Sequence, residues 1–493
     1  MTGQIQSIPL PEWWDPERVF QTLYSDHPYS FWLDAGANAV SGRSYLGVAT
    51  EHSRFVTASV ADGTVHVVTP GAPGVEGVTM RTTIFDFLRS DLAGTARPRA
   101  TSPGVDDPAS GGDDIFDGSF RLGWVGWLGY ELGSQTVGSP VHSAGHPDAA
   151  LLMVDRAIMF DHGTRTVTLL ARFGAEQPIQ DWATEVEFAL QTTPERPPAG
   201  PPASAVARWR HSPERYAELI AECLVAIRSG DVYQVCLTNE IRVDGAVDPV
   251  AAYLRLRESS PSHHGGLLRF GQTALLSASP EQFLQVTPHG EVRTKPIKGT
   301  RPRSVDAVRD GDLARELRSS EKERAENLMI VDLMRNDLGR IAELGSVAVS
   351  KLLAVESYRH VHQLVSTIEA RLAAGVTGVD VVAACFPAGS MTGAPKHSAM
   401  GIIDRLEGGP RGLYAGAFGY FGLDGAVDLA IIIRSIVLSP AGASIGTGGG
   451  ITALSDAREE IEETRIKAAA LLLALGAAPV SPDRGSATGK RGE

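Results

Sequence analysis

The chain has 493 residues, of which 43% are hydrophobic and 21% are charged, and its formal net charge at pH 7 is -13. This length allows roughly two to four folded modules with an extensive apolar interior, and no apolar run reaches the ~20 residues that span a membrane. Binding to nucleic-acid phosphates requires concentrated Lys and Arg, so an acidic chain without a basic stripe is not expected to bind nucleic acid.

Residues 1–11 lack the basic segment and apolar core of a secretory signal. The three cysteines, Cys223, Cys236 and Cys385, lie far apart, without the spacing of a zinc site or a redox disulfide. We therefore expect a cytoplasmic protein with three buried thiols.

Residues 1–193 are expected to form a mainly β region. Alternating β-branched and apolar runs such as 64–68 and 166–170 are typical of strands, and glycine-rich turns separate them. The proline-rich stretch 194–211 is expected to be a linker to the next region.

Residues 212–478 combine helices and strands. Ser212 followed by Pro213 predicts a helix start, and a strand is expected at 232–238. Because no regular alternation of strand and helix follows, we expect an α+β fold with large, mostly antiparallel sheets surrounded by helices. The polar residues 479–493 are predicted to form a disordered tail.

Lys298 lies in the segment 296–303, where two prolines and a glycine restrict the backbone. Desolvation, or neighbouring cations such as Lys295, Arg301 and Arg303, would lower the pKa of its ammonium group and make the amine a candidate nucleophile. The alternative is an ordinary basic turn at the surface.

Glutamates form two pairs with the same spacing. Glu323 and Glu326 lie three residues apart on one predicted helix, and Glu460 and Glu463 repeat the spacing on another. Side chains three apart leave the same helix face, so two facing pairs would offer Mg²⁺ an oxygen-rich site. The alternative is that all four are solvated surface glutamates.

The run 444–451 contains four glycines and follows an apolar strand. Such a run lets backbone N–H groups approach an anion, although a tight bend between strands explains it as well. Arg434 ends a nearby apolar run and would need an anionic partner if buried. Lys467 lies one turn after Glu463, where it could either bind a ligand or form a simple ion pair.

Two further segments could contribute polar groups. Residues 390–396, which include Thr392, contain a predicted helix start, and helix starts bind carboxylates readily. An ordinary capped helix is the alternative. His362 could act as an acid or orient a substrate hydroxyl, although a single histidine is more often structural.

These motifs occur in an order that resembles the chorismate-utilising enzymes, the group that contains anthranilate, aminodeoxychorismate, isochorismate and salicylate synthases. The resemblance covers roughly residues 212–475. The matching stretches are 230–235, 279–281, 296–303, 323–338, 362–366, 390–396, 411–414, 446–451 and 460–467. The resemblance implies an anthranilate-synthase-like fold and chorismate as the substrate.

The resemblance also implies a role for each motif. The two glutamate pairs would hold Mg²⁺, which binds the ring carboxylate of chorismate together with the glycine cradle. The substrate-binding residues implied are Gln234, Thr392, Tyr414, Arg434, Gly448, Gly449, Gly450 and Lys467. Glu281 would be the general acid beside the departing 4-hydroxyl, and His362 would lie close to the ring.

Two positions narrow the activity that the resemblance implies. Members that add water carry a lysine where this chain has Gln234, so isochorismate and salicylate synthesis are not expected. Lys298 stands where anthranilate synthases usually have alanine, and lysine there marks aminodeoxychorismate synthases. In those enzymes the lysine resembles a nucleophile that attacks C2 of chorismate before ammonia adds at C4. The product would be 4-amino-4-deoxychorismate, on the branch to 4-aminobenzoate and folate.

Other interpretations stay open. The chain could be an anthranilate or 2-amino-2-deoxyisochorismate synthase large subunit, or a silent subunit that binds an amidotransferase. No glutamine-hydrolysing domain is visible, so ammonia is expected from a separate glutamine amidotransferase subunit. Relatives bind tryptophan in the N-terminal region, but Ala35 replaces the serine of the family pattern, and tryptophan binding is not predicted.

Overall fold

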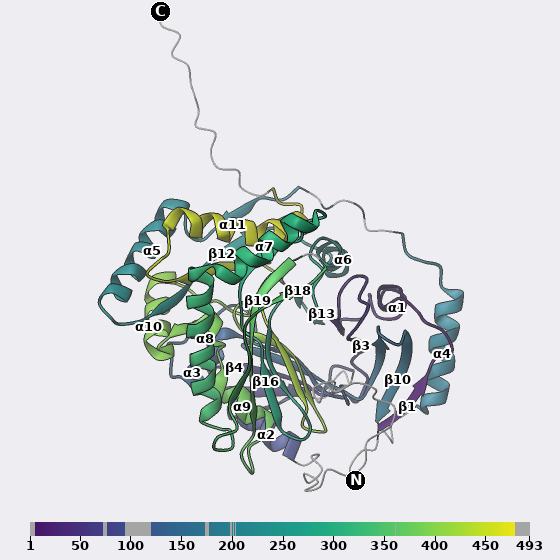
Figure 1. Cartoon of the computed structure of the whole chain (residues 1–493). Coiled ribbons are helices and arrows are strands. Elements are labelled where there is room, and N and C mark those ends of the chain that lie inside the picture. The colour runs from purple at the N-terminus through teal and green to yellow at the C-terminus, as the bar shows by residue number, and fades with distance from the viewer. Residues whose placement is uncertain are drawn as a thin grey trace, which may run out of the picture.

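The computed structural model describes residues 5–71, 76–93, 120–172, 177–197, 200, 202, 204–359 and 361–478. The predicted tail at 479–493 lies outside these residues, as does part of the predicted linker. Two large antiparallel sheets with helices around them fill the described part of the chain (Figure 1). The expected α+β class with large antiparallel sheets is confirmed.

The first sheet, which we call sheet A, combines strands from both sides of the predicted linker, and its strand β11 lies within the range 194–211 itself. Strand β20 (Gly393–Ala394) adds to it by pairing with β12. The order of its other strands is β1 (Ile5–Pro9), β10 (Thr166–Arg172), β9 (Arg156–Asp161), β3 (Arg43–Val48), β2 (Tyr29–Asp34), β13 (His264–Phe270), β14 (Thr273–Ser279), β23 (Ser435–Ser439), β24 (Gly442–Ile451), β12 (Gln234–Val243) and β11 (Ala207–Trp209).

The second sheet, sheet B, is also built from both parts of the chain. Strand β18 (Ala348–Ser357) pairs with β19 beside the main order. That order is β17 (Ile297–Pro302), β19 (Val361–Arg371), β16 (Glu291–Thr294), β15 (Gln282–Val286), β22 (Val427–Ile431), β21 (Ala417–Gly422), β7 (Gly123–Leu128), β8 (Ala149–Val154), β4 (Phe55–Ser59), β5 (Thr64–Val68) and β6 (Val78–Arg81).

Helices cover the outer faces of both sheets. In Figure 1, α5, α10 and α11 lie on the left and α1 and α4 on the right. The α-helices are α1 (Pro16–Leu23), α2 (Ile84–Ala93), α3 (Gly133–Thr136), α4 (Ile179–Thr192), α5 (Pro213–Arg228), α6 (Pro249–Ser259), α7 (Ala307–Ser319), α8 (Glu321–Gly339), α9 (Gly378–Cys385), α10 (Lys396–Glu407) and α11 (Ala457–Ala474), and short 3-10 turns cover Tyr130–Leu132 and Gly389–Met391. No helix in the described ranges is long and apolar enough to cross a membrane.

Local signals explain where several helices begin. Ser212 caps α5 by accepting a hydrogen bond from the backbone N–H of Arg215, and Pro213 occupies the first turn. Ser320 caps α8 in the same way, through the backbone N–H of Glu323. The cap at Ser320 fixes where α8 begins, and therefore the direction in which the predicted site residues Glu323 and Glu326 face.

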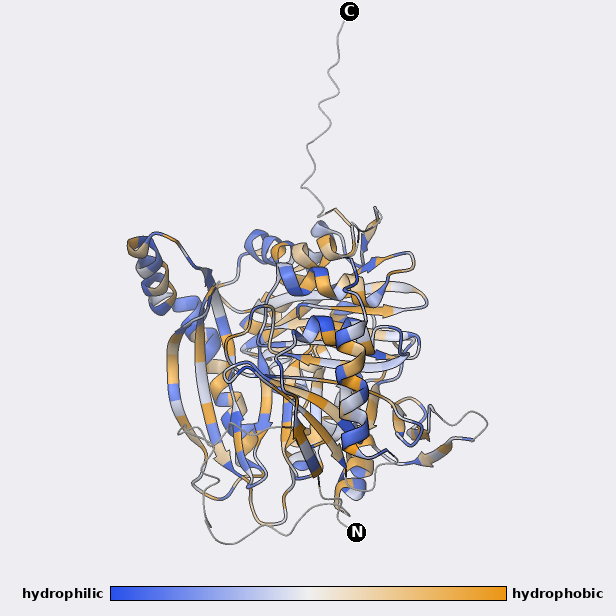
Figure 2. Cartoon of the chain, turned by 90° about the vertical axis from the view of Figure 1, so that its right-hand side faces the viewer, coloured by the Kyte–Doolittle hydropathy of each residue, from blue (hydrophilic) through white to orange (hydrophobic). Residues whose placement is uncertain are grey.

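The two sheets pack face to face around an aromatic core. Phe31 and Phe270 of sheet A and Trp127 and Phe418 of sheet B belong to this buried layer, and the rings of Trp127 and Phe270 stack with their centroids 4.9 Å apart. Strand β7 is buried along its whole length. Figure 2 shows the long apolar stretches of the strands in orange, whereas the outer helices alternate orange and blue. Burial of this apolar surface is the main source of stability.

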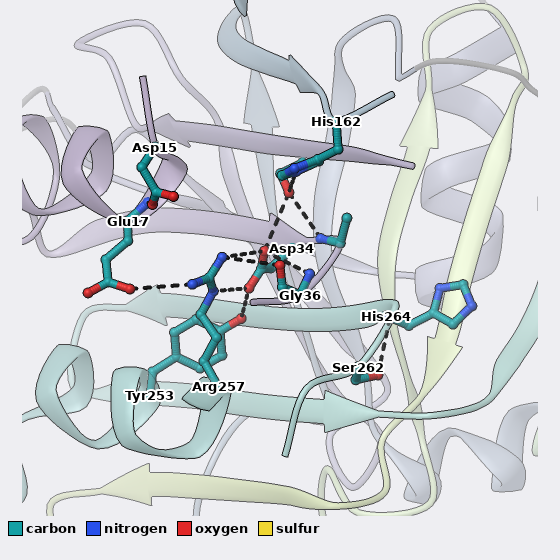
Figure 3. A network of polar contacts seen from close by, with 11 residues as sticks. Asp15, Glu17, Asp34, Gly36, His162, Tyr253, Arg257, Ser262 and His264 are labelled. Carbon is teal, nitrogen blue, oxygen red and sulfur yellow. Dashed lines mark hydrogen bonds and ion pairs between the residues drawn. The ribbon is translucent and has the colours of Figure 1, made fainter. Parts of the chain in front are cut away.

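A buried ion pair connects β2 to α6 (Figure 3). The Nε of Arg257 donates to Asp34 Oδ2 at 2.6 Å, and the Tyr253 hydroxyl donates to the same oxygen at 2.9 Å. The Asp34 side chain is fully buried and that of Arg257 is 9% exposed. Arg257 also contacts Glu17 of α1 at 3.3 Å. Because these groups come from both sides of the linker, the pair ties the two parts of the chain together.

We expect Asp34→Ala to destabilise the fold by about 3–5 kcal/mol, because it leaves the Arg257 charge buried without its partner. The measurement is the shift of the urea unfolding midpoint. The control is Asp26→Ala, which breaks an ion pair to Arg196 in which the aspartate is 84% exposed, and its expected cost is below about 1 kcal/mol. Equal costs for the two variants would contradict the structural role of the buried pair.

Candidate active site

A cavity of about 530 Å³ brings together most of the predicted site residues. It lies where β17 of sheet B, β24 of sheet A and helices α8 and α11 meet. The predicted residues that line it are Glu281, Lys298, Glu323, Glu326, Tyr414, Arg434, Gly448, Gly449, Gly450, Glu460, Glu463 and Lys467. Segments far apart in the sequence therefore build one polar pocket.

Lys298 projects from β17 into this cavity, with its side chain 13% exposed. Its Nζ lies 3.9 Å from Glu326 Oε2. Burial alone would lower the pKa of the Lys298 ammonium group, but Glu326, followed by other acidic groups that include Glu281, raises it above its ordinary value. The sequence expectation of a lowered pKa is therefore wrong for the metal-free chain.

The cations expected to act on Lys298 have acidic partners of their own. Arg301 pairs with Glu316 at 3.0 Å, Lys295 pairs with Glu356 at 3.4 Å, and Arg303 pairs with Asp310. Their charges are thus largely compensated, whereas the carboxylate of Glu326 faces Lys298 directly.

Gly299, the next residue, has a left-handed φ of +82°. A Cβ there would meet Leu317 at 2.7 Å and the Glu323 carboxylate at 2.8 Å. Only glycine therefore allows β17 to pass this close to α8.

The glutamate pairs lie on α8 and α11, on two sides of the cavity. Glu326 is 6% exposed and Glu460 is 2% exposed, so neither is a solvated surface glutamate. Burial raises the pKa of Glu326 to about 7, and the nearby Lys298 opposes this shift. Buried carboxylates with raised pKa values are typical of functional sites.

Each of the four carboxylates has a basic partner. The N–O distances are 3.6 Å for Arg301–Glu323, 3.9 Å for Lys298–Glu326, 2.9 Å for Lys322–Glu460 and 2.6 Å for Lys467–Glu463. Within the described ranges, no three acidic, histidine or cysteine side chains lie close enough together to hold a metal ion as they stand. The carboxylates are turned towards side-chain cations.

The two helices nevertheless direct their carboxylates at the same short stretch of β24. A Cβ on Gly449 would lie 2.9 Å from Glu460 Oε2 and 3.9 Å from Glu463 Oε1. A Cβ on Gly450 would lie 3.3 Å from Glu326 Oε2. Carboxylate oxygens from both helices thus lie beside two successive glycines of β24, and carboxylate oxygens are donors that suit a hard divalent cation.

The glycine run is part of a regular strand and not a tight bend. It lies in β24, which pairs with β12 from Ala443 to Ile451. A Cβ on Gly446 would lie 2.0 Å from the Tyr414 ring. Lys467 donates hydrogen bonds from Nζ to the carbonyl of Gly448 at 2.8 Å and pairs with Glu463. The glycines are required because side chains approach this strand closely.

Arg434 and Tyr414 both line the cavity and lie close enough together to influence each other's charge. Arg434 has no ion-pair partner among the described residues, and burial lowers the pKa of its guanidinium group. Burial also raises the pKa of the Tyr414 hydroxyl, so the hydroxyl stays protonated at neutral pH. Arg434 and Tyr414 therefore offer donors to an anion that enters the cavity.

Glu281 precedes β15 and is 6% exposed. Burial raises the pKa of its carboxyl group to about 6, while Lys298 and a hydrogen bond from Ser390 act in the opposite direction. A carboxyl group with such a pKa can both hold and release a proton near neutral pH.

Three predicted residues do not line the cavity. His362 faces away from it, with Nε2 3.0 Å from Asp310 Oδ1 and Nδ1 2.7 Å from Ser357 Oγ. Its neighbour Gln363 lines the cavity instead, because successive residues of a strand point to opposite faces. Thr392 is fully buried, and its hydroxyl bonds the carbonyl of Ala388 at 3.3 Å.

The third residue, Gln234, lies directly behind the glycine strand. It is fully buried, and neither Oε1 nor Nε2 of its amide has a hydrogen-bond partner among the described residues. A Cβ on Gly450 would lie 2.5 Å from Gln234 Nε2. An unpaired buried amide is costly, and the described residues supply no partner for the Gln234 amide.

The cavity residues Cys236, Lys322 and Gln363 are not among the predicted site residues, whereas Ser390 and Met391 belong to the predicted segment 390–396. Strand parity could have revealed Gln363 once a strand through His362 was expected. Lys322 lies in the first turn of α8 beside Glu323, among other charged residues. Nothing in the sequence distinguishes it from a solvent-exposed lysine. The place of Cys236 in the cavity depends on tertiary contacts.

The chain is similar to known proteins in sequence and in structure. Residues 72–473 match a family model described as chorismate binding enzyme. An aminodeoxychorismate synthase of Streptomyces griseus is 44% identical over 479 residues, which cover 95% of this chain and 64% of that protein. The chain therefore spans less than two thirds of that relative. Aminodeoxychorismate synthase component 1 of Salmonella typhimurium is 38% identical over 350 residues, covering 70% of this chain and 75% of that protein.

Among solved structures, anthranilate synthase component I from Streptococcus pneumoniae is similar, with a TM-score of 0.71 and 27% sequence identity. The match covers 94% of this chain and 98% of that one. The expected anthranilate-synthase-like fold is therefore confirmed.

The raised pKa of Glu326 leads to a prediction about stability without divalent metal. Between pH 4.5, the ordinary pKa of the group, and pH 7, its pKa in the folded chain, the folded chain keeps a proton that the unfolded chain has lost. The unfolding free energy therefore falls as pH rises through this range. Glu326→Gln has no carboxyl group at this position and does not lose stability in this way. The difference in unfolding free energy between Glu326→Gln and the unmodified chain should therefore shift in favour of the variant by about 1–3 kcal/mol from pH 4.5 to 7.5.

Urea unfolding in the presence of a chelator at a series of pH values measures this difference. Glu218→Gln, at an exposed carboxylate that pairs with Arg215, serves as the control. A stability difference between Glu326→Gln and the unmodified chain that stays constant with pH would refute the interpretation.

Proposed function

Because the chain belongs to the family of chorismate-binding enzymes, we propose that it aminates chorismate at C4 with ammonia and forms 4-amino-4-deoxychorismate. The observation that carries the proposal is Lys298, buried in the cavity beside Glu281 and the glutamate pairs. The aminodeoxychorismate synthases among its relatives support the same activity.

The cavity suits a substrate with two carboxylates. Glu323, Glu326, Glu460 and Glu463 would hold Mg²⁺, whose charge would bind the ring carboxylate beside Gly448–Gly450. Arg434 and Tyr414 would bind the enolpyruvyl carboxylate. An acidic protein would thereby bind a dianion through local positive groups.

Lys298 would act as a nucleophile in two steps. Its proton passes to the Glu281 carboxylate, and its free amine attacks C2 while the two conjugated ring double bonds shift and the C4–O bond breaks. Glu281 gives the proton to the leaving hydroxyl group, which departs as water. Ammonia then attacks C4, both double bonds shift back, the Lys298 amine is expelled with the electron pair of its bond to C2, and the new ammonium group at C4 can release a proton to solvent.

Gln234 would keep the site selective for ammonia. Its amide cannot remove a proton from water, so it does not activate water as an attacking group. Glu281, and not His362, supplies the acid in this proposal, because His362 faces Asp310 and Ser357. Ammonia would come from a separate glutamine amidotransferase, in keeping with a relative that is named component 1.

The test is an assay of the purified chain with chorismate, Mg²⁺ and ammonium, with products separated by chromatography and identified by mass. We expect 4-amino-4-deoxychorismate, and 4-aminobenzoate only after a lyase that removes the enolpyruvyl group is added. Direct formation of fluorescent anthranilate would refute C4 amination and favour the anthranilate synthase alternative. No turnover together with stable amidotransferase binding would favour a silent subunit.

We expect Lys298→Ala to lower amination by at least about 100-fold, because the covalent route is lost. Chorismate affinity should change less than about threefold, since Arg434, Tyr414 and the glutamates remain. Lys295→Ala is the control, because this lysine pairs with Glu356 and does not line the cavity. Turnover of Lys298→Ala at the level of Lys295→Ala would remove the nucleophile role.

A further inference from the structure

Lys322 has a contact that the proposed reaction leaves unexplained. It lies in the first turn of α8, beside Glu323, and its Nζ donates to Glu460 Oε1 of α11 at 2.9 Å. The Glu460 side chain is 2% exposed, whereas that of Lys322 is 27% exposed. Lys322 also lines the cavity.

This contact differs from the other ion pairs of the four glutamates. Lys467 and Glu463 lie on the same helix, and the N–O distances of Arg301–Glu323 and Lys298–Glu326 are longer, at 3.6 and 3.9 Å. Among the described residues, Lys322–Glu460 is the ion pair that joins the two glutamate-bearing helices directly. A divalent cation held by both helices would make the same connection.

We propose that Lys322 is the resident counter-cation of this site and that a divalent cation binds by displacing its ammonium group from Glu460. The inference rests on the proposed metal site and is independent of which product the enzyme forms. A Mg²⁺ ion requires carboxylate oxygens at about 2.0–2.1 Å. An ammonium group on the same carboxylate would then lie within a few ångströms of the ion, and the two positive charges would repel each other.

The surroundings of Lys322 allow such an exchange. Its side chain is partly exposed, and its flexible four-carbon stem can carry the ammonium group into water. Glu460 is almost completely buried and stays in place. In the metal-free chain the ammonium group therefore reduces the repulsion between the carboxylates, and in the metal-bound chain the ion takes over this role.

The exchange predicts that Lys322 weakens metal binding. In Lys322→Gln, Mg²⁺ no longer displaces a cation, and we expect its dissociation constant in calorimetric titration with Mg²⁺ alone to fall by roughly tenfold. The thermal midpoint of this variant in chelator should fall, and its increase on addition of Mg²⁺ should exceed that of the unmodified chain.

Arg324→Gln is the matched control, because it removes one positive charge from the same turn of α8. Arg324 is exposed and bonds the carbonyl of Arg318, not the glutamates. An equal gain in Mg²⁺ affinity in both variants would show a general effect of charge and overturn the proposal. Unchanged or weaker Mg²⁺ binding by Lys322→Gln, or no Mg²⁺ binding by either chain, would also overturn it.

If Lys322→Gln does not fold in chelator, Lys322→Arg tests the proposal instead. It retains the cation, so it should fold in chelator and bind Mg²⁺ within about threefold of the unmodified chain. A tenfold gain in affinity in this variant would contradict the displacement. All these titrations omit chorismate. Their results can therefore be interpreted even if the amination assay fails.

Discussion

The close approach of side chains to β24 is the constraint on which the cavity depends. The Tyr414 ring presses against Gly446 from one side, and the carboxylates of Glu460 and Glu326 reach Gly449 and Gly450. Any larger residue at one of these positions would need the space that the neighbouring ring or carboxylate now occupies. The glycine run is held as a paired strand of sheet A, so its role is not to make the backbone flexible. Its small residues instead set the dimensions of the site.

Charge compensation is the second condition for this site. Four glutamates around one pocket would repel one another, and a lysine or an arginine faces each of them. The same arrangement raises the pKa of the Lys298 ammonium group. In the metal-free chain Lys298 is thus held charged, and neutralising Glu326 would lower the pKa of its ammonium group.

Many of the site residues can be predicted from local sequence patterns. The others depend on the direction in which a side chain faces in the folded chain. Helix starts at Ser212 and Ser320 and the spacing of the glutamates are local, so they were predictable from neighbouring residues. The chemistry of histidine makes His362 a candidate in the sequence, yet strand parity turns its side chain towards Asp310 and places Gln363 in the cavity. The pKa of Lys298 depends on Glu326 from a distant helix, which no local pattern reveals.

The mixing of strands from both sides of the linker has a consequence for folding. Strand β7 pairs with β21, where Gly123 lies opposite Gly422, and β2 pairs with β13 at the centre of sheet A. These contacts join residues that are very far apart in the chain, so the relative contact order is high and folding is expected to be slow. On the ribosome, β7 can pair with β8 but lacks its other neighbour, β21, until residue 422 has been synthesised. During that interval its apolar surface and free edge are open to chaperones or to aggregation.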